Sequence, residues 1–159
     1  MVFATIVAAW LGSAAVEPPH GACSLATAAE AEKVLGATAI DVPPDQIGEE
    51  TAPTCLWASE GRRAEAKVTV WSREELPVLG LPDAASYFSK LRQEYATESI
   101  RYLEGLGERA FEAEFSPSAA MRASGTIVVL KADHVAVFEF VNVVPTGAHT
   151  FVASVVERL

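Results

Sequence analysis

Two valine-rich segments in the last third of the chain constrain its fold most strongly. Residues 126–130 and 135–141 are its most apolar runs after the N-terminal segment, and the short polar stretch 131–134 joins them. Short β-branched runs on either side of a polar turn are typical of a β-hairpin. The continuous Val-Val-Leu run is typical of a central strand. We therefore predict a hairpin at the centre of a sheet.

Four further segments alternate between apolar and polar residues with the period of two that half-buried strands require: 54–59, 66–71, 99–103 and 109–115. The first two are expected to form a hairpin, because only a short polar run separates them. In the last segment, Phe111 is expected to face the core and Glu112 to face solvent, since neighbouring side chains on a strand point to opposite faces.

Three helices are predicted, and the first has the clearest boundaries. Thr27 and Glu30 form an S/T-x-x-E capping box, in which each side chain can satisfy a free amide at the start of a helix. Gly36 is placed to end that helix. Asp83 can cap a second helix with an apolar stripe. Residues 150–159 carry valines at helical spacing, which predicts the third.

The resulting order is helix, two strands, helix, four strands and helix. It predicts an α+β fold, with a largely antiparallel sheet of about six strands and two to three helices packed on one face. Residues 37–53 hold three prolines and a glycine and are expected to be an irregular surface connection. At about 150 residues per domain, residues 16–159 form a single domain.

Residues 1–15 are predicted to be an export signal. The uncharged apolar run 2–11 has ten residues, which suits a secretory signal and falls short of the about 20 that a membrane-spanning helix needs. Ser13 and Ala15 are small, as cleavage after Ala15 requires. No Lys or Arg precedes the run. Either the signal therefore starts further upstream, or the segment is a buried helix or strand.

Cys23 and Cys55 are the only cysteines. An even count in an exported chain predicts a structural disulfide, and two buried free thiols in a cytosolic domain are the alternative. A disulfide that closes a loop of about 30 residues stabilises a fold by about 3.5–4 kcal/mol in the chain-entropy model. The pair lacks the further ligands of a zinc site and the C-x-x-C spacing of a redox motif. The residues before Cys23 make a poor lipidation site, because no Leu-like residue stands three positions before it.

Charge and motif content exclude several classes of protein. The chain carries 12 Lys and Arg against 21 Asp and Glu, a net charge of −9. Binding to nucleic acid or to an anionic membrane surface requires a basic patch, so neither is expected. No P-loop, H-E-x-x-H, G-x-S-x-G or EF-hand pattern is present, and we assign no cofactor, metal or catalytic residue. Gly105 and Gly107 formally match a dinucleotide fingerprint, but a strand pattern follows them and favours a hairpin turn.

Catalytic interpretations rest on isolated groups. Asp133 and His134 are adjacent, but on a strand they would point to opposite faces, which is unsuited to a catalytic pair. A loop serine, namely Ser116, Ser118 or Ser124, could act as a nucleophile only with a base within hydrogen-bond reach. A non-catalytic interpretation is therefore preferred.

The remaining polar groups are expected to lie at the surface. His149 is near the start of the last helix, where capping or solvation is expected. The carboxylate pairs at 49–50 and 74–75 have too few neighbouring oxygen ligands for calcium. We expect them to form solvated acidic surface.

Trp71, Lys67 and Thr69 are the candidate interaction surface. They alternate with Ala66 and Val68 along one strand, so they share the face opposite to these apolar residues. An aromatic residue on a sheet face is more often part of the core than of a binding site. The hypothesis therefore depends on whether Trp71 faces solvent.

The chain resembles small secreted or lipid-anchored actinobacterial domains of unknown function. The resemblance rests on short motifs that span most of the chain: Cys23 with the capped helix ending at Gly36, the Cys-Leu-Trp strand at 55–57, the Gly-Leu-Gly turn at 105–107 followed by Ala110, the valine-rich hairpin 126–141, and the C-terminal helix 150–159. It implies an exported compartment and the architecture described above.

These observations predict a secreted or periplasmic, non-catalytic domain that binds a protein or small ligand in the cell envelope. Two alternatives remain: a small secreted hydrolase with a loop serine nucleophile, and a purely structural envelope component. A hydrolase requires a His or carboxylate near the serine hydroxyl. A structural component would show neither a cleft nor an apolar patch.

Overall fold

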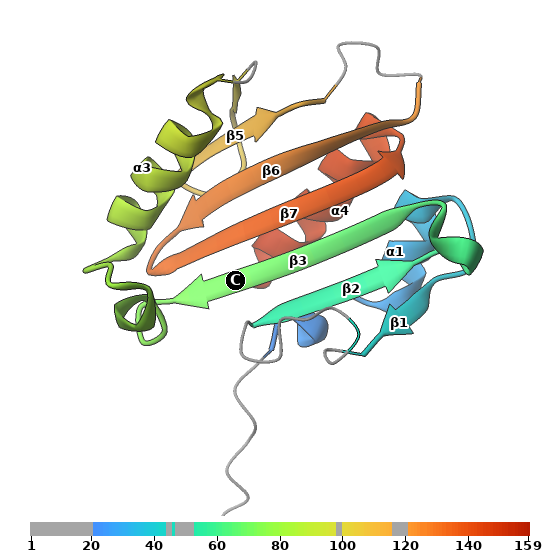
Figure 1. Cartoon of the computed structure of the whole chain (residues 1–159), viewed down its shortest axis with the longest axis horizontal. Coiled ribbons are helices and arrows are strands. Elements are labelled where there is room, and N and C mark those ends of the chain that lie inside the picture. The colour runs from blue at the N-terminus through green and yellow to red at the C-terminus, as the bar shows by residue number, and fades with distance from the viewer. Residues whose placement is uncertain (1–20, 44–45, 47–52, 98–99, 116–120) are drawn as a thin grey trace, which may run out of the picture.

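The computed structural model describes residues 21–43, 46, 53–97, 100–115 and 121–159, so the predicted export signal 1–15 lies outside the described residues. Within them, one antiparallel sheet has the strand order β1-β2-β3-β7-β6-β5-β4 (Figure 1). The strands are β1 Ile40–Val42, β2 Thr54–Ala58, β3 Glu65–Ser72, β4 Arg101–Leu103, β5 Arg109–Ala113, β6 Ala123–Lys131 and β7 His134–Val143. The predicted α+β fold is confirmed. The strands number seven rather than about six, because the segment expected to be irregular contributes β1.

The valine-rich hairpin occupies the middle of the sheet, as predicted. β6 pairs with β7 from Lys131 opposite His134 to Ala123 opposite Val143, and β7 also pairs with β3 along its length. Ile127, Val128 and Val135 are fully buried. The two predicted outer hairpins flank this centre.

Helix α1, Ala28–Leu35, has the predicted boundaries. Glu30 N donates to Thr27 Oγ1 at 3.3 Å, and Thr27 N donates to Glu30 Oε2 at 2.9 Å. These two bonds complete the capping box. Gly36 ends the helix in the left-handed region with a φ of 66°.

Cys23 and Cys55 form the predicted disulfide, with their Cα atoms 5.0 Å apart. Cys23 lies in a short 3-10 helix, Ala22–Ser24, and Cys55 lies in β2. The bond therefore ties the segment before α1 to the sheet.

Two helices cover one face of the sheet. They are α1 and α4, Pro145–Glu157, which begins at Pro145 rather than near residue 150. Both lie behind the sheet in Figure 1. Phe151 of α4 meets Trp57 of β2 edge to face, with ring centroids 5.9 Å apart. Both side chains belong to the larger buried cluster, which also contains Ile127 and Phe138.

The third helix, α3 Ala84–Glu94, covers the opposite face, so the expectation of helices on one face was wrong. Asp83 caps it as predicted, accepting a hydrogen bond from Ser86 N at 2.7 Å. Phe88 belongs to a second buried cluster with Phe111 and Val128. These strand residues alternate with those of the larger cluster. The central strands are apolar on both faces, and each face therefore requires its own cover.

Among the described residues, no helix combines the length and apolar character needed to cross a bilayer. In the same part of the chain, no group of three or more His, Cys, Asp or Glu side chains is placed to hold a metal ion.

Candidate functional site

Helix α3 crosses only one end of its sheet face, and a groove lies alongside it. The groove has a volume of about 260 Å³. Eight residues from β3, β7, α3 and the turn after α3 line it: Lys67, Thr69, Trp71, Tyr87, Leu91, Tyr95, Val137 and Glu139. The three residues predicted from the sequence as an interaction surface therefore lie together in one groove.

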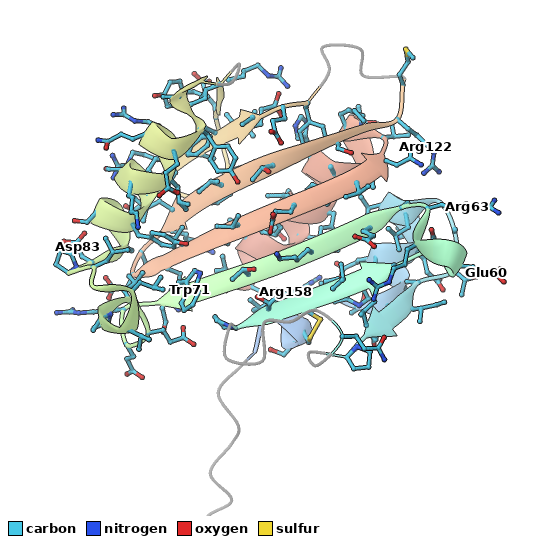
Figure 2. All side chains as sticks on the ribbon, in the orientation of Figure 1. Glu60, Arg63, Trp71, Asp83, Arg122 and Arg158 are labelled. Atoms are coloured by element: carbon cyan, nitrogen blue, oxygen red, sulfur yellow. A yellow bond between two sulfur atoms is a disulfide. The ribbon has the colours of Figure 1, made fainter. Side chains whose placement is uncertain are left out.

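Trp71 forms one end of the groove. It is half-buried, and its ring meets that of Tyr87 edge to face, with centroids 6.4 Å apart. Figure 2 shows it at the end of β3 beside α3. Trp71 is thus partly covered by α3 rather than fully exposed, and it presents part of its ring to the groove.

The strands contribute three polar residues to the floor of the groove, Lys67, Thr69 and Glu139, beside the apolar Val137. Lys67 of β3 stands opposite Glu139 of β7, and their side chains form an ion pair with Nζ and Oε2 2.8 Å apart. Thr69 is buried and shares a hydrogen bond of 2.9 Å with Thr54 of β2. The floor therefore offers donors and acceptors without a net charge.

The wall is aromatic. Burial raises the pKa of the Tyr87 phenol, and the charges of Glu94, Tyr95 and Glu139 add to this effect. Tyr87 therefore keeps its proton throughout the neutral range. The groove combines rings with a neutral polar floor, which suits a small ligand group with an apolar body and an uncharged polar end.

The sequence identified only part of this site. Tyr87 and Leu91 fall on the apolar stripe of the predicted second helix, and Glu139 falls in a predicted central strand, so neither pattern marks them as site residues. The alternating pattern within each strand does not show that Lys67 and Glu139 are neighbours. That follows only from the register between β3 and β7, which depends on the tertiary structure.

A second polar cluster contradicts two predictions from the sequence. Glu112 was expected to face solvent, but it is buried under α4, because the face opposite to Phe111 is covered too. Its carboxylate accepts a hydrogen bond from Arg101 Nε at 2.7 Å and lies 2.6 Å from His149 Nε2. His149 is therefore paired, rather than capping the helix or solvated.

The charge state of this cluster follows from its partners. Burial is the largest single influence on Glu112 and by itself raises its pKa. The hydrogen bonds and charges of Arg101 and His149 together outweigh burial, so the pKa of Glu112 is lowered. Among the described residues, no hydroxyl or thiol is hydrogen-bonded to His149, and the cluster joins β4, β5 and α4 as a structural clamp.

The other residues considered for catalysis lie apart from both clusters. Ser124 Oγ accepts a hydrogen bond from Asn142 N at 3.3 Å. His134 begins β7, and its Nδ1 is buried without a hydrogen-bond partner among the described residues. Ser116, Ser118 and the carboxylate pair at 49–50 lie outside the described residues.

Of the carboxylate pair at 74–75, expected to be solvated, Glu75 is half-buried and hydrogen-bonded instead. Glu75 accepts hydrogen bonds from the backbone N and side-chain Oγ of Ser72, both at 2.8 Å, and so stabilises the turn after β3. Gly105 and Gly107 have φ values of 76° and 59° in the turn between β4 and β5, which is the conformation predicted for a hairpin turn.

Comparison of the chain with protein-family models, with curated proteins and with solved structures finds no match.

Proposed function

We propose that this chain is an exported, non-catalytic binding domain, and that the groove beside α3 receives its ligand. The observation that carries the proposal is the meeting of Trp71, Tyr87 and Tyr95 around the Lys67–Glu139 pair. The Cys23–Cys55 disulfide supports an oxidising compartment, in keeping with a secreted or periplasmic location.

The shape and charge of the groove limit the ligand. Its volume of about 260 Å³ is near the lower end for ligand pockets. A group of that size is a small molecule, or one side chain of a partner protein in the cell envelope. Because Lys67 and Glu139 neutralise each other, the groove has no net charge to attract an ion. The recognised group therefore has an apolar body and an uncharged polar end.

The test is an NMR titration of the isotopically labelled full chain with a panel of small neutral aromatic and alcohol-bearing compounds. We expect the indole N–H resonance of Trp71 to shift with saturation. Replacing Tyr95, which lines the groove, by alanine should weaken that binding. The matched control is Tyr102→Ala, because Tyr102 is exposed at the β4 edge, outside the groove.

The outcomes separate the two sources of ligand. Saturable binding of a small compound supports a free ligand. If no compound binds, chemical cross-linking from a photoreactive residue at position 71 in intact cells tests for a partner side chain. Failure of both experiments, or equal loss of binding in Tyr95→Ala and Tyr102→Ala, would contradict the proposal.

A further inference from the structure

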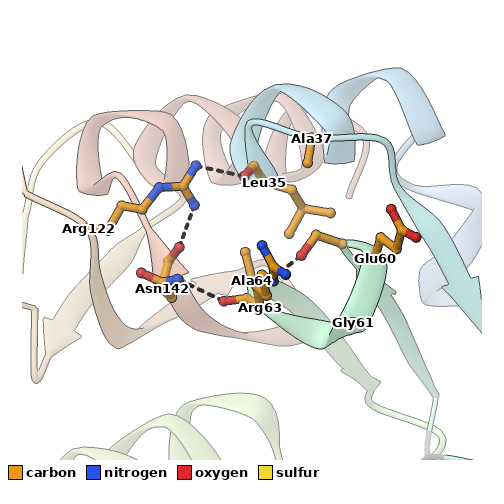
Figure 3. A pocket seen from close by; sticks show the side chains of 9 residues that line it. Leu35, Ala37, Glu60, Gly61, Arg63, Ala64, Arg122 and Asn142 are labelled. Atoms are coloured by element: carbon orange, nitrogen blue, oxygen red, sulfur yellow. Dashed lines mark hydrogen bonds between the residues drawn. The ribbon is translucent and has the colours of Figure 1, made fainter.

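A second pocket lies at the opposite end of β3 from Trp71 (Figures 2 and 3). Its volume is about 550 Å³. The end of α1, the turn between β2 and β3, and the ends of β6 and β7 supply its lining: Leu35, Ala37, Ser59, Glu60, Gly61, Arg63, Ala64, Arg122 and Asn142. No motif in the sequence pointed to it.

Arg122 is held in place by neutral groups. Its Nη2 donates to Leu35 O at 3.1 Å, and its Nη1 donates to Asn142 O at 2.7 Å. Both acceptors are backbone carbonyls, and no carboxylate of a described residue pairs with the guanidinium, although the end of α1 contributes partial negative charge. A guanidinium has five N–H donors, and further donors remain for a ligand.

Glycine at position 36 makes this arrangement possible. A Cβ there would lie 2.7 Å from Arg122 Nη2. Gly36 therefore both ends α1 in the left-handed region and leaves space for the guanidinium against the helix terminus. The positive charge is fixed at the pocket by the fold.

Arg63 supplies a second guanidinium. Its backbone carbonyl accepts a hydrogen bond of 2.8 Å from Asn142 Nδ2, which fixes this residue relative to β7. Its side chain is exposed and forms no ion pair or hydrogen bond within the described parts of the chain. Asn142 itself has a φ of 53°, so one strained residue orients the backbone next to both arginines.

The balance of charge favours an anion. Two arginines and one carboxylate, that of Glu60, line the pocket, whereas the whole chain has a net charge of −9. In Figure 3, Glu60 lies on the wall away from Arg122. A cationic pocket in an acidic protein concentrates anions locally, since the guanidinium fork matches the geometry of phosphate and carboxylate oxygens.

We propose that this pocket binds an oxyanion, the phosphate or carboxylate group of a small molecule, through the side chains of Arg63 and Arg122. Asn142 positions both arginines. This site is separate from the groove beside α3, so the outcome for one does not decide the other.

The test is an NMR titration of the full chain with inorganic phosphate and, separately, with acetate, at constant ionic strength to hold screening fixed. We expect saturable shifts confined to the amides of residues 36–37, 60–64 and 142. The key variant is Arg63→Gln, because Arg122 also secures α1 and its loss could alter stability. Arg63→Gln should weaken binding by about tenfold or more, as expected for a lost charged hydrogen bond.

The matched control is Arg62→Gln. Arg62 is an exposed neighbour in the same turn and does not line the pocket, so this variant removes the same charge and should leave binding unchanged. Tighter binding of phosphate or of acetate identifies the group recognised. The proposal is overturned if neither probe saturates, if Arg63→Gln binds as the unmodified chain does, or if the two variants weaken binding equally.

Discussion

Arg158, just after α4, forms a two-pronged ion pair with Glu30, the capping carboxylate of α1. Nη2 lies 2.6 Å from Oε1 and Nη1 lies 3.0 Å from Oε2. Nη1 also donates to Leu25 O at 2.6 Å. The hydrogen bond from Arg158 is the largest of the influences that lower the pKa of Glu30, from 4.5 to about 2, and the bonds from Thr27 assist it. One carboxylate thus caps α1 and fastens it to the end of α4.

This pair predicts a loss of stability in acid. Because the pKa of Glu30 is lower in the folded than in the unfolded chain, its contribution is complete above pH 4.5 and disappears as the pH falls towards 2. We expect Glu30→Gln to lower the free energy of unfolding at pH 7 by about 1 kcal/mol. The difference should vanish near pH 2, as measured by urea unfolding.

The control for this prediction is Glu32→Gln, on the same helix. The side chain of Glu32 forms no hydrogen bond or ion pair with any described residue, so its replacement should change stability little at any pH. A deficit in Glu30→Gln that stayed constant from pH 7 to pH 2 would show that the charge of Glu30 is not the cause.

Loss of the disulfide is expected to lower the free energy of unfolding by more than loss of the Glu30 charge does. Replacing Cys23 and Cys55 together by alanine should lower the free energy of unfolding by about 3–4 kcal/mol, because the unfolded chain gains the entropy of an open loop. This loss of stability can be measured by guanidinium unfolding of the variant, of the reduced protein and of the oxidised protein. The variant and the reduced protein should have similar midpoints, and a variant as stable as the oxidised protein would contradict the prediction.

Replacing the two glycines of the β4–β5 turn by alanine distinguishes the cost of a steric clash from the cost of a positive φ. A Cβ at Gly107 would lie 2.5 Å from Leu130 O, whereas at Gly105 it would meet nothing within 4 Å. Both residues have positive φ, so alanine costs about 1 kcal/mol at either position. We expect Gly107→Ala to cost about 3 kcal/mol in total, because the backbone of β6 must also shift. Equal losses in urea unfolding would be inconsistent with the observed close approach.

The Glu112–His149 pair predicts energetic coupling. A double-mutant cycle with Glu112→Gln and His149→Gln should give a coupling energy of about 1 kcal/mol, since Glu112 is buried while His149 is partly exposed. The control cycle uses Lys90 and Glu94, an exposed pair whose charged atoms are 3.8 Å apart. It should give about 0.3 kcal/mol. If the Glu112–His149 coupling energy were as small as that of Lys90 and Glu94, Glu112 would not be holding β5 and α4 together.

Local signals in the sequence predicted local structure well. The capping box at Thr27 and Glu30, the cap at Asp83 and the valine-rich hairpin each depend on neighbouring residues, and the structure confirms them. The disulfide followed from the number of cysteines. β1 was missed because Ile40–Val42 is too short for an alternating pattern and exists through its pairing with β2.

Long-range relationships could not be predicted in the same way. The alternation in β5 placed Phe111 and Glu112 on opposite faces correctly, but it could not show that α4 covers the face of Glu112. The groove beside α3 and the pocket at Arg122 each join segments distant in sequence. Their residues carry no common motif. The crossing of α3 over β3 and β7 forms the groove, whereas the end of α1, the β2–β3 turn and the ends of β6 and β7 come together at the pocket.

The strand order also determines when the sheet can be completed. β7, the last strand described, inserts between β3 and β6, so two half-sheets must wait for it, each with an unpaired edge. Cys55 lies in the half-sheet β1-β2-β3 and Cys23 in the 3-10 helix before α1, so both precede β7 in the chain and can join before β7 is added. A chain shortened before β7 would retain both bare edges, and we expect it to aggregate rather than fold. The sheet can therefore be completed only after residues 134–143 have been synthesised.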